Sequence, residues 1–145
     1  MIGLIQRVSS AAVDVKNKNV AQIERGLLVL IGVQPNDSEQ AADKLLHKLL
    51  NYRVFEDEKG RMNLSVADTE GGLLLVPQFT LAADTRSGMR PGFSTAASPE
   101  LGKKLFEYLL HQAQRQHKCV GSGVFGADMQ VSLVNEGPAT FWLEV

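Results

Sequence analysis

Two short motifs contain residues that are able to do chemistry, and both motifs lie where an apolar run ends. In Pro77-Gln78-Phe79-Thr80, Thr80 carries the only hydroxyl. A threonine hydroxyl attacks a carbonyl when a base lies beside it, and otherwise it positions a substrate by hydrogen bonding. The second motif, Asn135-Glu136-Gly137-Pro138-Ala139-Thr140, places glycine and proline between two strand-like runs, where a sheet normally tolerates neither. We infer that this pair has a role other than stabilising a sheet.

The usual catalytic and metal-binding signatures do not occur in the rest of the chain. Neither motif contains a histidine or a lysine that would activate Thr80, so positioning is favoured over covalent catalysis. There is no glycine-rich phosphate loop, dinucleotide fingerprint or Gly-x-Ser-x-Gly elbow. Cys119 is interpreted as a strand residue, and it forms no zinc-site spacing with His47, His111 and His117. We therefore predict neither a metal nor a cofactor.

A long segment without periodicity separates the first motif from the next helix-like run. It carries two arginines and an aromatic residue, Arg86, Arg90 and Phe93. Guanidinium groups beside an aromatic ring suit contact with phosphates and bases. Loops of this length are often functional in compact domains, but a solvated surface loop fits the same composition. Both interpretations stay open at this point.

Length and composition describe one ordinary domain. The chain has 145 residues, 44% of them hydrophobic, with a formal net charge of -1 and a pI near 6.3. This size and apolar content suffice for a substantial core, so we predict a single domain over residues 1–145. The charge balance provides no basic field, which leaves local clusters of Lys and Arg to contact any nucleic acid. A single cysteine, no signal-like start and no apolar run of about 18 residues predict a cytoplasmic protein without a membrane partner.

The apolar patterns predict two helices among many strands. A capping-box sequence at Asp37 is followed by leucines at helical spacing over 38–50. Ser98-Pro99 fits the start of a second helix that extends to about Gln116. Runs typical of strands cover 2–8, 11–15, 20–23, 27–33, 52–55, 73–76, 129–134 and 140–145. We predict an α+β domain in which a mainly antiparallel, barrel-like sheet carries two principal helices on its outside.

The two motifs together resemble the D-aminoacyl-tRNA deacylase family, whose signatures are Ser-Gln-x-Thr and Asn-x-Gly-Pro-x-Thr. Pro77 departs from this pattern, because the family usually has serine there, and a serine nucleophile is therefore excluded. The resemblance extends over essentially the whole chain, through Leu4-Ile5-Gln6-Arg7-Val8, Lys59-Gly60-Arg61-Met62-Asn63-Leu64, Phe79-Thr80-Leu81-Ala82-Ala83-Asp84-Thr85 and Ala127-Asp128-Met129-Gln130-Val131-Ser132-Leu133-Val134-Asn135.

The resemblance implies an editing hydrolase that cleaves the ester of D-aminoacyl-tRNA, and of mischarged glycyl-tRNA, to release amino acid and tRNA. Its partner is the acceptor end of an aminoacyl-tRNA, and it works as a homodimer whose active site lies at the subunit interface. The Gly137-Pro138 bond is expected to be cis and to enter the neighbouring subunit's site. A main-chain element beside the α-carbon rejects every L side chain sterically, whereas glycine has no side chain to reject.

The resemblance also distributes roles over individual residues. Because the first motif ends a strand and can present unpaired N–H groups, backbone amides near Phe79 and Thr80 are expected to donate to a developing oxyanion. Arg7 is expected to brace the carbonyls of the Gly-Pro segment. The residues expected to be catalytic are Gln78, Phe79 and Thr80, and those expected to bind substrate are Gly137, Pro138, Phe125, Met129 and Arg7.

Several of these roles compete with structural ones. Phe125 and Met129 provide apolar surface for the terminal adenine, or equally they pack in the core. Gln78 is also expected to fix the end of its strand, and Asn135 to cap the backbone of the turn. The basic residues expected to follow the acceptor stem are Arg86, Arg90, Lys103 and Lys104.

Two other classes of function fit the sequence. The chain is alternatively a tRNA-binding module without catalysis, or a proteolytic or amidase-like threonine hydrolase unrelated to RNA. Under the favoured interpretation, the terminal 2′-hydroxyl of the substrate helps to activate water. That assistance would explain why neither motif supplies a side-chain base.

Overall fold

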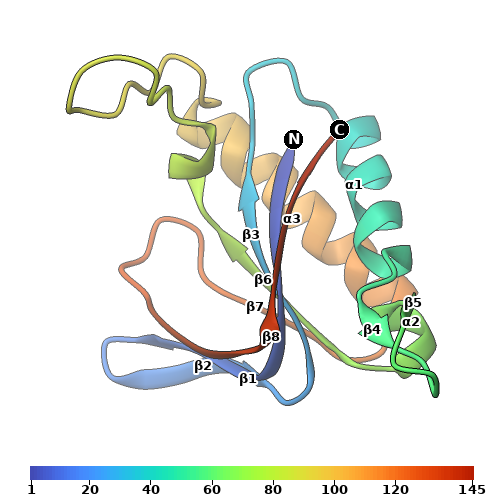
Figure 1. Ribbon diagram of the computed structural model, residues 1–145. Coiled ribbons are helices and arrows are strands. Elements are labelled where there is room, and N and C mark those ends of the chain that lie inside the picture. The colour runs from blue at the N-terminus through green and yellow to red at the C-terminus, as the bar shows by residue number, and fades with distance from the viewer.

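The computed structural model describes all residues 1–145 and contains both strands and helices (Figure 1). Two long helices and one long, bent pair of strands dominate the fold. The elements in chain order are β1 (Ile2–Val15), β2 (Lys18–Ile23), β3 (Gly26–Gly32), α1 (Glu39–Asn51), β4 (Phe55–Glu56), β5 (Met62–Leu64), α2 (Val66–Thr69), β6 (Gly72–Pro77), the 3-10 helix η1 (Phe79–Ala82), α3 (Pro99–Gln116), β7 (Val120–Ser122) and β8 (Gln130–Glu144).

The principal sheet is mixed, which corrects the expectation of a mainly antiparallel sheet. Its strand order is β2-β1-β3-β6-β7, and β8 pairs with β1. The three partners of β1 are antiparallel to it, but β3 pairs with β6, and β6 with β7, in parallel. The parallel pairs follow from the way in which these strands are connected. The segment from β3 to β6 contains α1, and the segment from β6 to β7 contains α3, and such long helical crossovers return the chain in the same direction.

The sheet curls so that β2 approaches the far end of the strand order. A β-carbon placed on Gly121 of β7 would lie 3.3 Å from Ala21, and one placed on Gly72 of β6 would lie 2.7 Å from Ile23. Glycine at these two positions permits the close approach. The result is the barrel-like, nearly closed shape that was expected.

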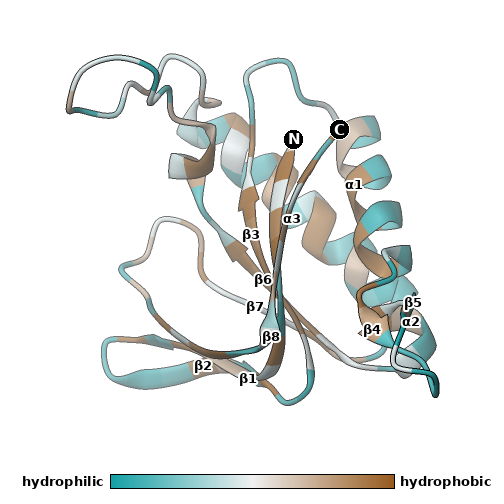
Figure 2. Ribbon diagram, in the orientation of Figure 1, coloured by the Kyte–Doolittle hydropathy of each residue, from teal (hydrophilic) through white to brown (hydrophobic).

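The two long helices cover one face of the sheet, and the larger core lies between them and the strands (Figure 2). Alternate residues of the central strands point to this face, among them Ile5, Val29 and Leu75. A smaller cluster lies on the other face, inside the curl, and includes Val13 and Leu74. The buried stripes of the helices are Ala42, Leu45, Leu46, Leu49 and Leu50 in α1, and Gly102, Leu105, Phe106, Leu109 and Ala113 in α3. The expectation of two principal outer helices is confirmed.

Both helix starts differ little from prediction. Ser98 caps α3 by accepting a hydrogen bond from the Leu101 amide, and Pro99 is the first helical residue, as expected. The cap of α1 is Ser38 rather than Asp37. The Asp37 carboxylate instead accepts a hydrogen bond from the chain's amino group at 2.7 Å.

Several strand boundaries were wrong. The runs 2–8 and 11–15 form one continuous strand, β1, because antiparallel partners cover its whole length. The strand predicted over 52–55 is only Phe55–Glu56. The assignment of Cys119 to a strand was wrong, because β7 begins at Val120 and the exposed Cys119 lies just before it. The short elements β5, α2 and β7 had no periodic signal long enough to predict them. No helix combines the length and the apolar character needed to cross a membrane.

Candidate active site

The first motif forms a turn at the end of β6. The Gln78 amide donates to the Ile31 carbonyl of β3 at 2.7 Å, and the chain then turns into η1. The Leu81 amide donates to the Gln78 carbonyl, so the amides of Phe79 and Thr80, which precede Leu81, have no carbonyl partner within η1. The side chains of Phe79 and Thr80 are exposed. This turn therefore presents unused backbone donors beside a hydroxyl group.

Gln78 orients the hydroxyl of Thr80. Its side-chain amide donates a hydrogen bond to Thr80 Oγ1. A neutral amide nitrogen does not accept a proton, so Gln78 cannot act as the base that a threonine nucleophile requires. This contact suits a positioned hydroxyl rather than an activated one.

The second motif is a bulge in β8 rather than a loop between two strands. Thr140 pairs with Gln6 and Asn135 pairs with Val8, so the β8 residues between them face Arg7 alone. Within this bulge the Gly137-Pro138 peptide bond is cis, which confirms that expectation. Gly137 has a φ of +132°, and both residues are exposed. Their main chain is thus accessible from outside the subunit.

Arg7 lies beneath the bulge and fixes it. Its side chain is buried, and its Nε donates to the Glu136 carbonyl at 3.0 Å while Nη1 donates to the Val54 carbonyl at 2.6 Å. A β-carbon placed on Gly137 would lie 2.7 Å from Arg7 Nη2. Arg7 therefore braces the carbonyl that precedes Gly137, close to the expected role, and ties the bulge to the segment before β4 through Val54.

Asn135 caps the other side of the bulge, as expected. Its Oδ1 accepts a hydrogen bond from the Ala139 amide at 2.8 Å, and its Nδ2 donates to Thr140 Oγ1 at 2.9 Å. An outer contact was not anticipated from sequence. The Glu136 carboxylate lies 3.6 Å from Nε of Arg25, whose guanidinium sits 5.3 Å from the centre of the Phe55 ring. The carbonyl and the side chain of Glu136 are thus contacted by two different arginines.

A single subunit does not bring the two motifs together. Gln78 adjoins Ile31, which pairs with Gly3, whereas the bulge faces Arg7, four positions further along β1. Four positions correspond to about 13 Å along a strand, and three strand spacings separate β8 from β6, or about 14 Å. In Figure 1, the short yellow-green turn after β6 lies near one end of the sheet and the bend of β8 near the other.

Phe125 and Met129 lie in the segment between β7 and β8, where each packs against a different core. The Phe125 ring packs against the larger cluster, and a β-carbon placed on Gly102 of α3 would lie 3.4 Å from it. Met129 packs against the smaller cluster, and its Sδ accepts a hydrogen bond from the Val124 amide at 3.4 Å. Both are only partly buried, so packing leaves part of each side chain accessible.

The segment after η1 is ordered by local contacts. Asp84 and Gly92 exchange two backbone hydrogen bonds, at 2.8 and 2.9 Å, which close a loop between them. Inside it the Arg86 guanidinium binds both carboxylate oxygens of Asp84, at 2.9 and 2.7 Å. These bonds hold the pKa of the Asp84 carboxyl well below its usual range. The Phe93 ring lies 5.3 Å from that of Phe79, at 47°.

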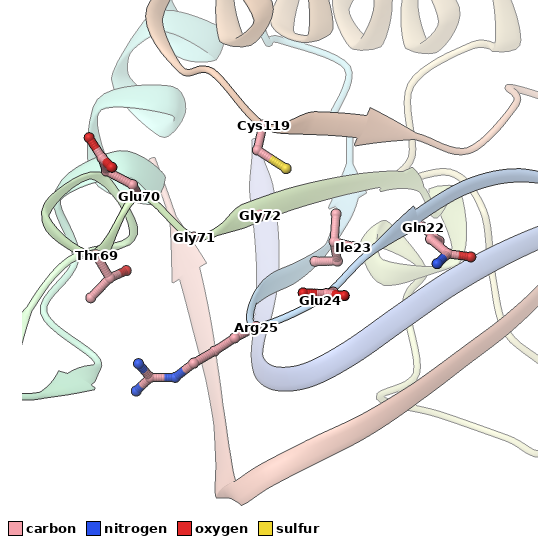
Figure 3. Close-up of a pocket in the computed structure, with 9 residues that line it drawn as sticks. All are labelled: Gln22, Ile23, Glu24, Arg25, Thr69, Glu70, Gly71, Gly72 and Cys119. Carbon is pink, nitrogen blue, oxygen red and sulfur yellow. The ribbon is translucent and has the colours of Figure 1, made fainter.

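The structure also contains a pocket of about 550 Å³ that sequence reasoning missed (Figure 3). It lies between the turn that joins β2 to β3 and the turn that joins α2 to β6, and Cys119 forms one wall. Arg25, which contacts Glu136 of the bulge, also lines this pocket. No group of three or more His, Cys, Asp or Glu side chains has the arrangement to hold a metal ion.

Comparison with known proteins gives consistent matches over the whole chain. A D-aminoacyl-tRNA deacylase of Pseudomonas putida (strain W619) is 67% identical over 145 residues, which is 100% of both chains. A D-aminoacyl-tRNA deacylase of Pseudomonas fluorescens (strain Pf0-1) is 64% identical over 144 residues, or 99% of each chain. These relatives support the interpretation of the motifs given above.

Solved structures share the fold. One described as a c-Myc DNA unwinding element binding protein has a TM-score of 0.96 at 36% identity and covers 100% of this chain and 99% of its own. A second, described as a probable eukaryotic D-amino acid tRNA deacylase, has a TM-score of 0.88 at 18% identity and covers 99% and 98%. The D-Tyr-tRNA(Tyr) deacylase family matches residues 4–144. The chain therefore belongs to the D-Tyr-tRNA(Tyr) deacylase family and is a hydrolase of the aminoacyl-tRNA ester.

Proposed function

We propose that this protein hydrolyses the ester between a D-amino acid, or glycine, and the terminal adenosine of tRNA, at a site built by two subunits. One subunit contributes Gln78, Phe79 and Thr80, and its partner contributes the Gly137-Pro138 bulge. The observation that carries this proposal is the separation of the two exposed motifs within one chain. A symmetric pair of subunits brings the bulge of each to the η1 turn of the other.

The chemistry assigned to the η1 turn is oxyanion stabilisation. An aminoacyl ester is an activated acyl group, so orientation and a few donors accelerate its hydrolysis without a strong nucleophile. The amides of Phe79 and Thr80, which have no partner within η1, are the proposed donors. The Thr80 hydroxyl, oriented by Gln78, positions the substrate. Phe125 and Met129 offer their accessible apolar parts to the adenine.

The chirality filter is assigned to the main chain of the bulge. Gly137 allows close approach to the substrate because it has no β-carbon, and Arg7 and Asn135 hold the backbone on either side of it. A rigid backbone beside the α-carbon excludes an L side chain of any type and admits glycine. Because charged tRNA is used by ribosomes, the proposed location is the cytoplasm.

Hydrolysis of matched D- and L-aminoacyl-tRNA tests the proposal, with glycyl-tRNA as a third substrate. Rapid release from the D form and from glycyl-tRNA, and slow release from the L form, is the expected result. Equal cleavage of the D and L forms would contradict the proposed filter. Binding of tRNA without any cleavage would show a tRNA-binding module instead. Full activity on a substrate ending in 2′-deoxyadenosine would exclude assistance by the 2′-hydroxyl.

A further inference from the structure

Phe79 and Phe93 form an exposed aromatic pair at the edge of the proposed catalytic turn. The two residues are 57% and 46% exposed, although their ring centres lie 5.3 Å apart in a tilted arrangement. Exposed aromatic side chains that gather on one surface commonly mark a binding site. Phe79 directly precedes Thr80, so whatever contacts this pair adjoins the bound ester.

The loop that follows η1 holds the pair in place. The two Asp84–Gly92 backbone hydrogen bonds close the loop just before Phe93. After Phe93, the Thr95 hydroxyl donates to the Ala82 carbonyl at 2.6 Å, and the chain then returns to the sheet. Figure 1 shows the loop, in yellow and olive, projecting from the body of the molecule. The aromatic pair thus stands on a fixed base beside a projecting loop.

The segment that contains η1 and the loop after it carries one more positive charge than negative charge. Residues 79–98 contain two arginines and one aspartate, a net charge of +1 in a chain of net charge -1. Asp84 neutralises Arg86 through its two-oxygen contact. Arg90 is exposed and takes part in none of the ion pairs of the structure. One guanidinium therefore remains available for an external anion beside an aromatic surface.

We propose that the Phe79–Phe93 pair and Arg90 bind the unpaired nucleotides that precede the terminal adenosine of the tRNA. A base stacks on the exposed rings, and Arg90 contacts a phosphate of the same strand. Aromatic surfaces combined with a nearby cation are the usual means of binding single-stranded nucleic acid. This inference rests on the proposed function, since it assumes that the ester occupies the site beside Thr80.

The test compares two substrates of the unaltered protein and of the variants Phe93→Leu and Arg90→Gln. One substrate is full-length D-aminoacyl-tRNA, and the other is the same D-amino acid esterified to adenosine alone. Each variant should raise KM for the tRNA by about tenfold, the scale of a lost stacking contact, with kcat unchanged. Hydrolysis of the adenosine ester should not change, because that substrate does not reach the pair. Arg90→Gln should also reduce the slope of log KM against log salt by about 0.7.

Two control variants, both outside the loop, test whether loss of any exposed ring or charge has the same effect. Tyr52 is an exposed residue whose ring packs edge-on against Phe141, and Arg61 is an exposed arginine near the β4–β5 turn. Tyr52→Leu and Arg61→Gln should leave both substrates unaffected. Equal losses on both substrates by Phe93→Leu would mean that Phe93 only supports Phe79, and no loss on either would refute nucleotide binding by the pair. Failure of the unaltered protein to cleave D-aminoacyl-tRNA would instead refute the proposed function.

Discussion

The η1 turn and the β8 bulge are both exposed. The side chains that orient them act over different distances along the sequence. At the turn, Gln78 contacts Thr80 two positions away. At the bulge, Arg7 contacts the carbonyl of Glu136, 129 positions away, and that of Val54, 47 positions away. The Gln78 amide also reaches Ile31 of β3, and Asn135 also caps the bulge locally. Only the bulge, however, is held by a buried side chain from a distant part of the chain, that of Arg7. This difference predicts that substitutions will affect the two regions in different ways.

The largest effect should come from Gly137→Ala. The new β-carbon would lie 2.7 Å from Arg7 Nη2, and the φ of +132° is one that residues with side chains rarely adopt. Displacement of the bulge should reduce D-aminoacyl-tRNA hydrolysis by about 100-fold or more. Gly60→Ala is the matched control, because Gly60 has a φ of +73° but nothing within 4 Å of the added carbon. Near-normal activity of Gly137→Ala would show that the bulge does not approach the substrate.

Arg7→Met should lower the free energy of unfolding by about 2–3 kcal/mol, because the Val54 carbonyl is left without its buried donor. Urea unfolding measures this loss, and hydrolysis of the D and L esters measures the loosening of the bulge. Arg53→Met is the control, since Arg53 is exposed and its side chain donates a hydrogen bond only to the exposed Asn63. If Arg7→Met is as stable as the unaltered protein, the bulge is not coupled to the fold through this side chain.

Thr80→Ala should change activity without changing stability. Loss of one positioning hydrogen bond predicts a decrease in kcat of about tenfold, and the exposed site predicts a normal unfolding transition. A covalent mechanism instead predicts a decrease of about 10⁴-fold or more. Single-turnover hydrolysis separates the two cases, with Thr80→Ser as the variant that retains a hydroxyl.

The smallest effect should be on the ionisation of Asp84, whose carboxylate is bound by Arg86, two positions along the chain. Its pKa in the folded protein is lowered, chiefly by the hydrogen bonds from Arg86. The stabilisation from this pair is therefore complete above the unfolded pKa of about 3.9 and is lost only as pH falls toward the lower folded value. NMR titration should find the Asp84 carboxylate still ionised at about pH 3. In Arg86→Gln, the midpoint should return toward the ordinary value, and an unchanged midpoint would contradict the assigned cause.

The difference between local and long-range contacts also explains which features could be predicted from the sequence. The helices were predictable because leucine spacing and the Ser98-Pro99 start are local signals. The apolar run over 27–33 correctly predicted strand β3, but no local signal revealed that β6 lies parallel to it. Arg7 was assigned to the bulge by family resemblance, and its second acceptor, Val54, lies too far along the chain for any local pattern. The role of Glu136 in contacting Arg25 was missed for the same reason.

The bulge has a further consequence for the behaviour of the protein at high concentration. Strand β8 pairs only with β1, so its other side is an open edge where a foreign strand could attach and start aggregation. The row of free amides and carbonyls along that edge is interrupted where the β8 residues between Asn135 and Thr140 bulge away, and Pro138 has no amide to offer. A segment proposed to discriminate between substrates thus also limits the pairing of foreign strands along the open edge of β8, while it stays available for the proposed contact with a second subunit.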